Sequence, residues 1–170
     1  FPRYGRHLGT PYHSVRSETF HDNLEPMLGR LFRLGVKIRE VEADQVILDD
    51  GSSLRADVVI DARGWAPFPS EHCGFQKFTG IDFRLSRPHG LTQPLVMDAT
   101  VEQNDGYRFV YLIPWSPTEL LVEDTRYSDS AELDSGRDER AIHDYVRARG
   151  WEIHSELRRE RGVLPVPTRV

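Results

Sequence analysis

The chain has 170 residues, of which 38% are hydrophobic and 29% are charged, and its formal net charge is -5. This composition is too hydrophobic for a disordered chain and too charged for a membrane-spanning one, and it lacks the basic excess that non-specific nucleic-acid binding requires. The single cysteine, Cys73, excludes an intrachain disulfide and a multi-cysteine zinc site, and it favours a reducing compartment.

The first ten residues contain neither a methionine nor the apolar core of a signal peptide. The longest apolar run, residues 109–113, is far shorter than the roughly 20 residues that span a bilayer. We therefore expect an internal piece of a longer, cytoplasmic protein, and we expect any contact with a membrane to be peripheral.

A helix is predicted over about residues 19–34, where apolar residues recur at helical spacing. These residues are Phe20, Leu24, Met27, Leu28, Leu31 and Phe32. Thr19 followed by Asp22 is similar to a capping box, and Gly35 fits a left-handed helix stop. The pattern indicates an amphipathic helix.

Short strands are predicted next, at residues 36–42 and 45–49, with a hairpin turn at 49–52 and a further strand that ends at residue 61. Residues 58–60 are uniformly apolar, which is typical of a strand buried on both faces of an α/β sheet. Asp61, Arg63 and Gly64 follow this run directly. Since ligands of open α/β sheets bind at the carboxyl ends of strands, these three residues are either the edge of a ligand site or a solvated turn.

From Gly74 onward the pattern predicts strands at 75–85, 94–101, 106–113 and 119–127, which we interpret as an antiparallel meander. A second helix over about 138–149 and a last strand to Leu164 complete the chain. Residues 64–74, with Pro67 and Pro69, form the predicted boundary between an α/β lobe at 1–64 and a β-rich lobe at 65–170. The predicted fold class is therefore α/β plus β-rich.

Side chains alternate between the two faces of a strand, so the predicted hairpin sorts the residues of 106–127. With a symmetric loop at 114–118, Phe109 lies opposite Glu123 and Arg108 lies directly across from Asp124. One face then collects Tyr107, Phe109, Tyr111 and Glu123. The other face holds Arg108 and Asp124, which are expected to form a structural ion pair.

A carboxyl group in an apolar, aromatic surface has a raised pKa, so Glu123 is a candidate general acid. Aromatic rings attract a cation by about 0.5–2 kcal/mol each, so the three rings could shield a carbocation. The alternative is an ordinary aromatic core with Glu123 hydrogen-bonded or exposed at a strand end. His89, in a tight loop, is either a substrate contact or a turn residue. No spacing of histidines indicates a metal site.

Seven stretches of the chain resemble the lycopene cyclase family of carotenoid biosynthesis, most closely its bacterial β-cyclases. They are DARG (61–64), GFQKF (74–78), PHGL (88–91), MDATV (97–101), DGYRFVY (105–111), VEDTRYSD (122–129) and ERGVLP (160–165). The resemblance implies that Glu123 is the catalytic acid and that Asp124 has at most a secondary role in catalysis. Plant relatives carry Phe-Leu-Glu-Glu-Thr where this chain has Leu-Val-Glu-Asp-Thr at 121–125, so the second carboxylate is one methylene shorter here.

The resemblance also implies a reaction without net redox change that requires reduced FAD, with NAD(P)H as the reductant. The substrate would be lycopene, a lipid-soluble linear polyene, whose terminal double bond Glu123 would protonate before the end group closes to a β-ionone ring. Tyr107, Phe109, Tyr111 and His89 would then line the substrate or the ring cation.

A glycine-rich turn of the Gly-x-Gly-x-x-Gly type, which seats the FAD pyrophosphate in such folds, is absent from these 170 residues. Asp61, Arg63 and Gly64 are the candidate flavin contacts that the chain itself offers. We therefore expect the chain alone to be inactive. Two alternatives are a flavin-dependent hydroxylase or halogenase of similar architecture and a non-catalytic carrier of a hydrophobic ligand.

Overall fold

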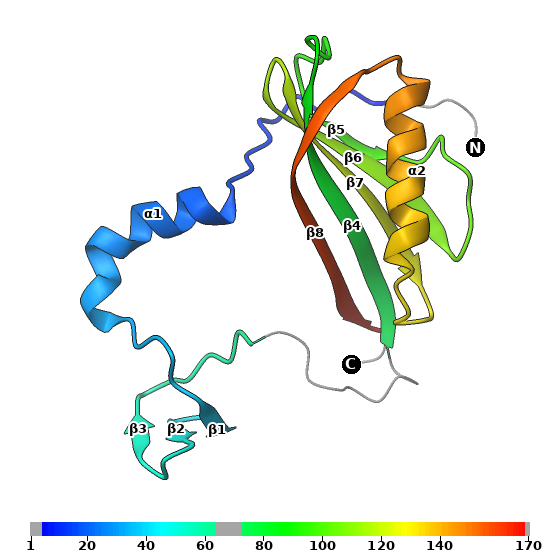
Figure 1. Cartoon of the computed structure of the whole chain (residues 1–170). Helices are drawn as coiled ribbons and strands as arrows, with labels where there is room; N and C mark the ends of the chain where they lie inside the picture. The colour runs from blue at the N-terminus through cyan, green and yellow to red at the C-terminus, as the bar shows by residue number, and fades with distance from the viewer. Residues whose placement is uncertain (1–4, 64–72, 169–170) are drawn as a thin grey trace. The chain divides into compact units, whose positions relative to one another are not determined.

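The computed structural model describes residues 5–63 and 73–168 (Figure 1). The chain divides into two compact units, Gly9–Gly64 and Trp65–Val170, the latter together with Phe1–Leu8. The described residues form two antiparallel sheets and a few helices, which agrees with the mixed class expected from the sequence. Within the described ranges no helix is both long enough and apolar enough to cross a membrane.

The unit Gly9–Gly64 contains helix α1 (Ser17–Leu28), the short 3-10 helix η1 (Gly29–Leu31) and a three-stranded sheet. The sheet has the order β1-β2-β3, with β1 at Ile38–Val41, β2 at Gln45–Leu48 and β3 at Ser53–Arg55. The predicted hairpin turn at 49–52 is confirmed. Gly51 has a φ of 85° there, and the Asp50 carboxylate accepts a hydrogen bond from the Ser52 amide at 2.9 Å.

The predicted bounds of the first helix are wrong at both ends. Helix α1 begins after Arg16, without a side-chain cap, so the capping box at Thr19 does not form. It ends at Leu28, because Gly29 weakens the helix and the chain tightens into η1 from that residue. Gly35 does adopt a left-handed φ of 71°, but it lies beyond the helix.

The predicted strand at residues 58–60 is also wrong. These residues are not in a strand, and Val58 and Ile60 are 71% and 86% exposed. A fully buried strand requires paired strands on both sides and a layer over each face. Among the described residues of this unit, no strand pairs with 58–60 in that way.

The second unit is built on a five-stranded antiparallel sheet with the order β5-β6-β7-β4-β8. Its strands are β4 (Cys73–Leu85), β5 (Leu95–Asp98), β6 (Tyr107–Ser116), β7 (Glu119–Ser128) and β8 (Ile153–Pro167). The predicted meander is confirmed for β5, β6 and β7. The position of β4 differs from that in a meander, because this long, almost fully buried strand pairs with β7 on one side and β8 on the other instead of with β5.

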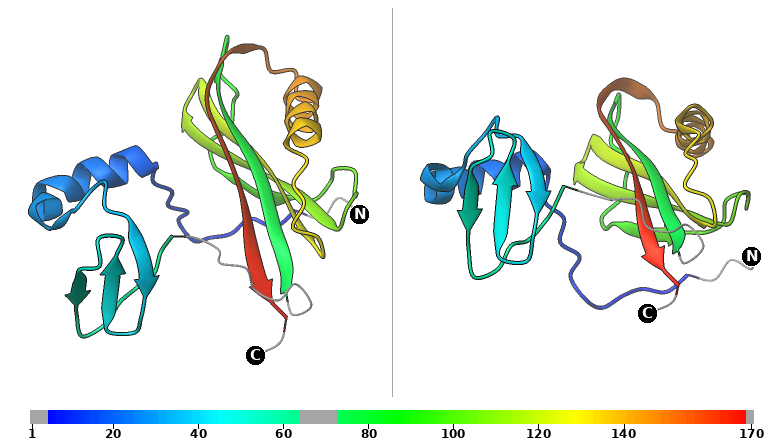
Figure 2. Two further views of the ribbon diagram at one scale, coloured as in Figure 1. Left: turned by 60° about the horizontal axis from the view of Figure 1, so that its bottom comes forward. Right: turned by 90° about the horizontal axis from the view of Figure 1, so that it is seen from below.

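Helix α2 (Ser135–Ala148) lies across one face of this sheet (Figure 2). The Asp134 carboxylate caps it by accepting a hydrogen bond from the Arg137 amide at 3.0 Å. Ile142 and Val146 project from α2 into the core. The core consists of these two residues and Ile81, Phe83, Leu85, Val110, Leu112, Leu120 and Val122. We call the face of the sheet that packs against α2 the helix-covered face, and the opposite face of the sheet the open face.

The register between β6 and β7 is shifted by two residues from the predicted one. Strand β6 continues through Pro114 to Ser116, with a bulge, and turns at residues 117–118 rather than over 114–118. Tyr111 therefore lies opposite Glu123, and Phe109 lies opposite Thr125. Because the shift is even, each side chain stays on its predicted face.

Candidate active site

Glu123 lies on the open face, in a row of residues that runs across four strands. Tyr111 of β6 is paired with Glu123 of β7, which is paired with Gly80 of β4, which is paired in turn with Glu160 of β8. Strand alternation therefore places two carboxyl groups on one face, on either side of a residue without a side chain.

The carboxyl group of Glu123 is half-buried and has one neutral donor close to it. The Thr125 hydroxyl donates a hydrogen bond to Glu123 Oε1 at 2.9 Å. Burial raises the pKa of Glu123, the Thr125 hydrogen bond opposes that rise, and the negative charge of Glu160 adds to it. The net direction is upward, as expected for a group that keeps its proton to higher pH than an ordinary glutamate.

An aromatic cluster centred on Phe109 lies on the open face and includes Tyr111, the residue opposite Glu123. The Phe109 ring is 0% exposed and packs against three tyrosines, with ring-centre distances of 5.5 Å to Tyr107, 5.4 Å to Tyr111 and 5.8 Å to Tyr127. Tyr107 and Tyr127 are exposed at the outer end of this group. The three aromatic residues predicted from the sequence thus form one cluster, in which Tyr111 is the residue opposite Glu123. Tyr127 is a fourth member that the sequence analysis did not single out.

A chain of polar contacts leads from Glu160 across the open face. Arg158 Nη2 donates to Glu160 Oε2 at 2.8 Å, and Arg158 Nη1 lies 3.9 Å from Asp82 Oδ2. The Trp115 indole donates to Asp82 Oδ1 at 2.6 Å. Sequence analysis assigned no role to these residues, although Glu160 falls within the ERGVLP stretch that contributed to the family resemblance.

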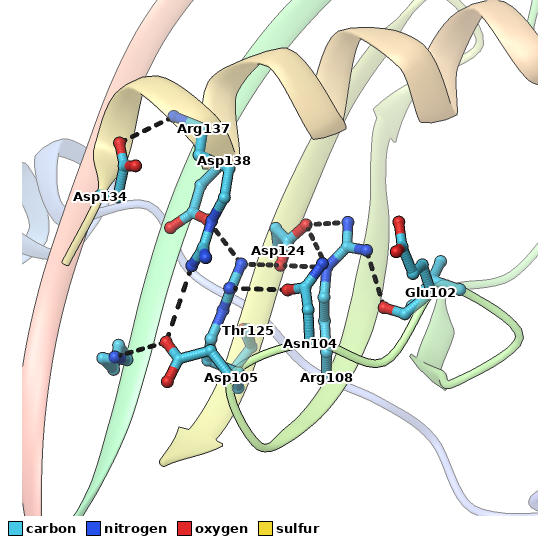
Figure 3. A network of polar contacts seen from close by, with 12 residues as sticks. Glu102, Asn104, Asp105, Arg108, Asp124, Thr125, Asp134, Arg137 and Asp138 are labelled. Atoms are coloured by element: carbon cyan, nitrogen blue, oxygen red, sulfur yellow. Dashed lines mark hydrogen bonds and ion pairs between the residues drawn. The ribbon is translucent and has the colours of Figure 1, made fainter. Parts of the chain in front are cut away.

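Asp124 lies on the helix-covered face, as predicted, and its carboxylate is fully engaged there (Figure 3). Arg108 Nε donates to both carboxylate oxygens, at 3.0 and 2.9 Å, which confirms the predicted ion pair. Arg126 Nη2 donates to Asp124 at 3.1 Å and to Asp138 of α2 at 2.5 Å. The network thereby ties β6 and β7 to the helix.

The same network extends through Arg137 and Asp105 to Lys77 of β4, which is 1% exposed. Its ammonium group donates to Asp105 at 2.9 Å, and this hydrogen bond lowers the pKa of Asp105. Burial raises the pKa of Asp138, and the Arg126 charge opposes that rise. Paired buried charges of this kind fix the packing of α2 on the sheet.

His89 is buried in the loop between β4 and β5, and both of its ring nitrogens bond to the main chain. Nδ1 accepts a hydrogen bond from the Leu91 amide at 3.0 Å, so Nε2 carries the hydrogen and donates to the Ser116 carbonyl at 2.7 Å. The ring links this loop to the end of β6. The structure thus places His89 in a tight loop, with its polar atoms occupied by backbone groups.

Asp61 and Arg63 belong to the other unit, and Gly64 lies outside the described residues. Arg63 Nε and Nη2 donate to the Asp61 carboxylate at 2.9 and 2.7 Å, and this pairing lowers the pKa of Asp61 to about 2. The Arg63 guanidinium is therefore occupied locally. Among the described residues no group of histidine, cysteine and acidic side chains could hold a metal ion.

Comparison with known proteins places these residues in context. The family model described as lycopene cyclase protein matches residues 3–169. Over 166 residues, 98% of this chain, the chain is 45% identical to a lycopene beta-cyclase of Paracoccus sp. (strain N81106 / MBIC 01143) and 43% identical to that of Pantoea ananas. It is 41% identical to that of Pseudescherichia vulneris over the same length. The chain spans 42–44% of the length of these relatives. No solved structure matches the chain.

Proposed function

The chain belongs to the lycopene cyclase family, and on that premise we propose that the protein to which it belongs cyclises the ends of linear lycopene to β-ionone rings. The reaction is an isomerisation that begins with proton transfer from Glu123. The observation that carries the assignment is the half-buried carboxyl group of Glu123, with its raised pKa, directly opposite Tyr111 and close to Phe109 on the open face.

Glu123 supplies the initiating proton to the terminal double bond of the polyene. The Thr125 hydroxyl holds Oε1, so the proton resides on Oε2. Protonation creates a carbocation, the end group closes to a ring, and loss of a proton from the ring cation forms the ring double bond. The number of protons is unchanged over the cycle, and no electrons are lost or gained.

The aromatic residues Tyr107, Phe109 and Tyr111 stabilise and shield the cation. Their ring faces are negative, and exclusion of water strengthens the attraction. His89 contributes indirectly, since its ring bonds fix the loop at the end of β6. Asp124 has a structural role, because Arg108 and Arg126 already bind its carboxylate.

We propose reduced FAD, regenerated by NAD(P)H, as the cofactor, with residues 1–64 forming part of its lobe. The described residues by themselves do not suit the group: Arg63 is paired with Asp61, and the 170 residues contain no glycine-rich phosphate turn. No step of the reaction is therefore assigned to the flavin. The 170-residue chain, titrated with FAD and followed by flavin fluorescence, should show no saturable binding, and micromolar binding would refute this part of the proposal.

We propose that the protein is cytoplasmic. Because lycopene dissolves in lipid, we also propose that the protein binds membranes peripherally. The full-length protein should sediment with liposomes. Full activity on liposome-embedded lycopene by a protein that never sediments with the liposomes would contradict this attachment.

The decisive test is Glu123→Gln in the full-length protein with reduced FAD. The amide keeps the size of the side chain but cannot supply the proton, so cyclisation should fall by about 10²–10⁴-fold, as is typical for the loss of a general acid. Glu119→Gln is the matched control, because Glu119 lies on the same strand and face and pairs with Arg84.

Products are separated by chromatography, and flavin reoxidation is followed in parallel. The control should cyclise at the wild-type rate. Normal turnover by Glu123→Gln would refute the proposed acid. Stoichiometric consumption of NADPH per product would instead indicate an oxygen-using flavoenzyme, and recovery of unchanged lycopene from the wild-type protein would indicate a carrier.

A further inference from the structure

The row across the open face contains a second carboxyl group, that of Glu160, to which the proposed reaction assigns no role. We infer that Glu160 is a positioning residue that keeps Glu123 protonated, with its carboxylate folded over Gly80 toward Glu123. This inference rests on the proposed general-acid role of Glu123.

The backbone register brings the two glutamates together. Gly80 of β4 is paired with Glu123 on one side and with Glu160 on the other, so the Cα atoms of the two glutamates lie two strand spacings apart, or about 10 Å. A glutamate side chain on the middle strand would fill the space between them. Glycine leaves that space open.

The side chain of Glu160 occupies the space over Gly80. A Cβ atom built on Gly80 would lie 3.0 Å from Glu160 Cγ and 3.2 Å from Glu160 Oε1, which is tighter than ordinary contact. Glu160 therefore leans across the middle strand rather than away from it. The same Cβ atom would lie 3.2 Å from Leu121 Cδ1, so Leu121 closes the space on the side of β7.

The two carboxyl groups have different partners, which decides where the proton resides. Glu160 accepts a hydrogen bond from the Arg158 guanidinium, whereas the hydrogen bond to Glu123 comes from the neutral Thr125 hydroxyl. A cationic donor favours the ionised form and two nearby carboxylates disfavour double ionisation. Of the two carboxyl groups, Glu123 is therefore the one whose charged form is disfavoured.

Other ionisable groups face the pair from each neighbouring strand. Asp82 of β4 accepts the Trp115 hydrogen bond, and the second guanidinium nitrogen of Arg158 lies 3.9 Å from it. Tyr111 of β6 lies opposite Glu123. Arg158 is thus shared between Asp82 and Glu160, so its single positive charge does not neutralise both carboxylates, and the Glu160 charge still raises the pKa of Glu123.

The test is the pH profile of cyclisation by the full-length protein with reduced FAD. Activity requires protonated Glu123, so it declines as the pH rises through the pKa of that group. Glu160→Gln removes the negative charge and lowers that pKa. The decline in cyclisation activity should move to lower pH. Activity at neutral pH should fall several-fold, and acidification should restore it. Glu160→Asp, which keeps the charge, should retain a profile closer to that of the wild type.

Gly80→Ala provides a second and independent variant. Its methyl group pushes Glu160 aside while both carboxylates remain. The decline in cyclisation activity should therefore move to lower pH, as in Glu160→Gln. Glu156→Gln on the opposite face of β8 is the control and should leave the profile in place. A purely structural role of Glu160 would lower activity equally at every pH, and that outcome would overturn the inference.

Infrared titration of the resting protein separates this inference from the proposed function. The carbonyl band of protonated Glu123 is identified by its absence in Glu123→Gln, and its disappearance with rising pH is compared between the wild type and the Glu160 variants. Disappearance at lower pH in Glu160→Gln supports the inference even if Glu123→Gln still cyclises lycopene, which would refute only the acid role. If the band disappears at the same pH in the wild type and in Glu160→Gln, the inference about Glu160 is overturned, whatever the cyclisation activities of the two proteins are.

Discussion

Glu123 and Asp124 are consecutive residues of β7, yet they lie on opposite faces of the sheet and in opposite electrostatic surroundings. Asp124 is buried against Arg108 and Arg126, which supply charged donors to its carboxylate. Glu123 is half-buried with a neutral hydroxyl donor, so burial raises its pKa, and the charge of a second carboxylate adds to that rise. Burial with cationic partners stabilises a charge, whereas burial without them retains a proton. Strand alternation alone thus separates a carboxylate held by two arginines from the carboxyl group that we propose as the catalytic acid.

The apolar residues of the two faces differ in the same way. On the helix-covered face, Leu112 and Val122 are fully buried and pack against Ile142 of α2. On the open face, the residue after Leu112 is Ile113, which is only half-buried. The helix-covered face therefore contains the core cluster of this unit, whereas the open face combines buried residues such as Phe109 with partly exposed ones such as Ile113.

Asp124→Asn should have the largest effect on stability. It leaves the buried Arg108 without its carboxylate partner, whereas Arg126 keeps Asp138, so the free energy of unfolding of the full-length protein should fall by about 3–5 kcal/mol. Urea denaturation measures the change. Glu123→Gln, one residue away, should not reduce this free energy at neutral pH. Comparable losses in both variants would show that the two faces do not differ.

Leu112→Ala and Ile113→Ala compare the two faces with the apolar side chains of adjacent residues. Truncation of the fully buried Leu112 should cost about 2–5 kcal/mol of unfolding free energy through lost burial and a cavity. The cost for Ile113 should be less than half of that, because its side chain is already partly in water. Equal costs would mean that the open face is packed as tightly as the other in the complete protein.

Gly162→Ala tests a close approach on the open face. The Phe78 ring lies over Gly162 of β8, and a Cβ atom there would come within 2.6 Å of Phe78 Cε1. The ring must move, at a cost of about 1–3 kcal/mol typical of overpacking. The double variant with Phe78→Leu should recover most of the loss. If Gly162→Ala is as stable as the wild type in urea, the ring does not pack on β8 as described.

The faces of the sheet were predictable from sequence, because alternation depends only on the parity of the residue number. The Arg108–Asp124 pair and the aromatic group followed from it. The register was not predictable, since β6 runs through Pro114, a residue that usually ends central strands, and turns later with a bulge. The even shift preserved the assignment of faces.

The place of β4 next to β8 and the pairing of Glu160 with Gly80 depend on contacts between strands about 80 residues apart. Local patterns carry no signal for such pairing, so the second carboxyl group was missed. The opposite error occurred at residues 58–60, where the apolar run predicted a buried strand but Val58 and Ile60 are exposed, and no strand of the sheets in the described ranges includes them. An apolar run favours burial, but it does not specify the strands that would provide it.

The smallest expected effect is the pH dependence of stability at Glu123. Its pKa in the folded protein lies above the ordinary value of 4.5, so the folded state binds the proton more tightly than the unfolded state. The stabilisation is complete below pH 4.5 and is lost as the pH rises through the folded pKa. Glu123→Gln has no proton to lose, so its stability relative to the wild type should increase across that window and then level off. Urea denaturation of both proteins at a series of pH values measures the difference, with Glu119→Gln as a reference for amide substitution on the same face. A difference that is constant with pH would mean that Glu123 titrates as it does in the unfolded chain, and the open face would then lack the property that distinguishes it from the helix-covered one.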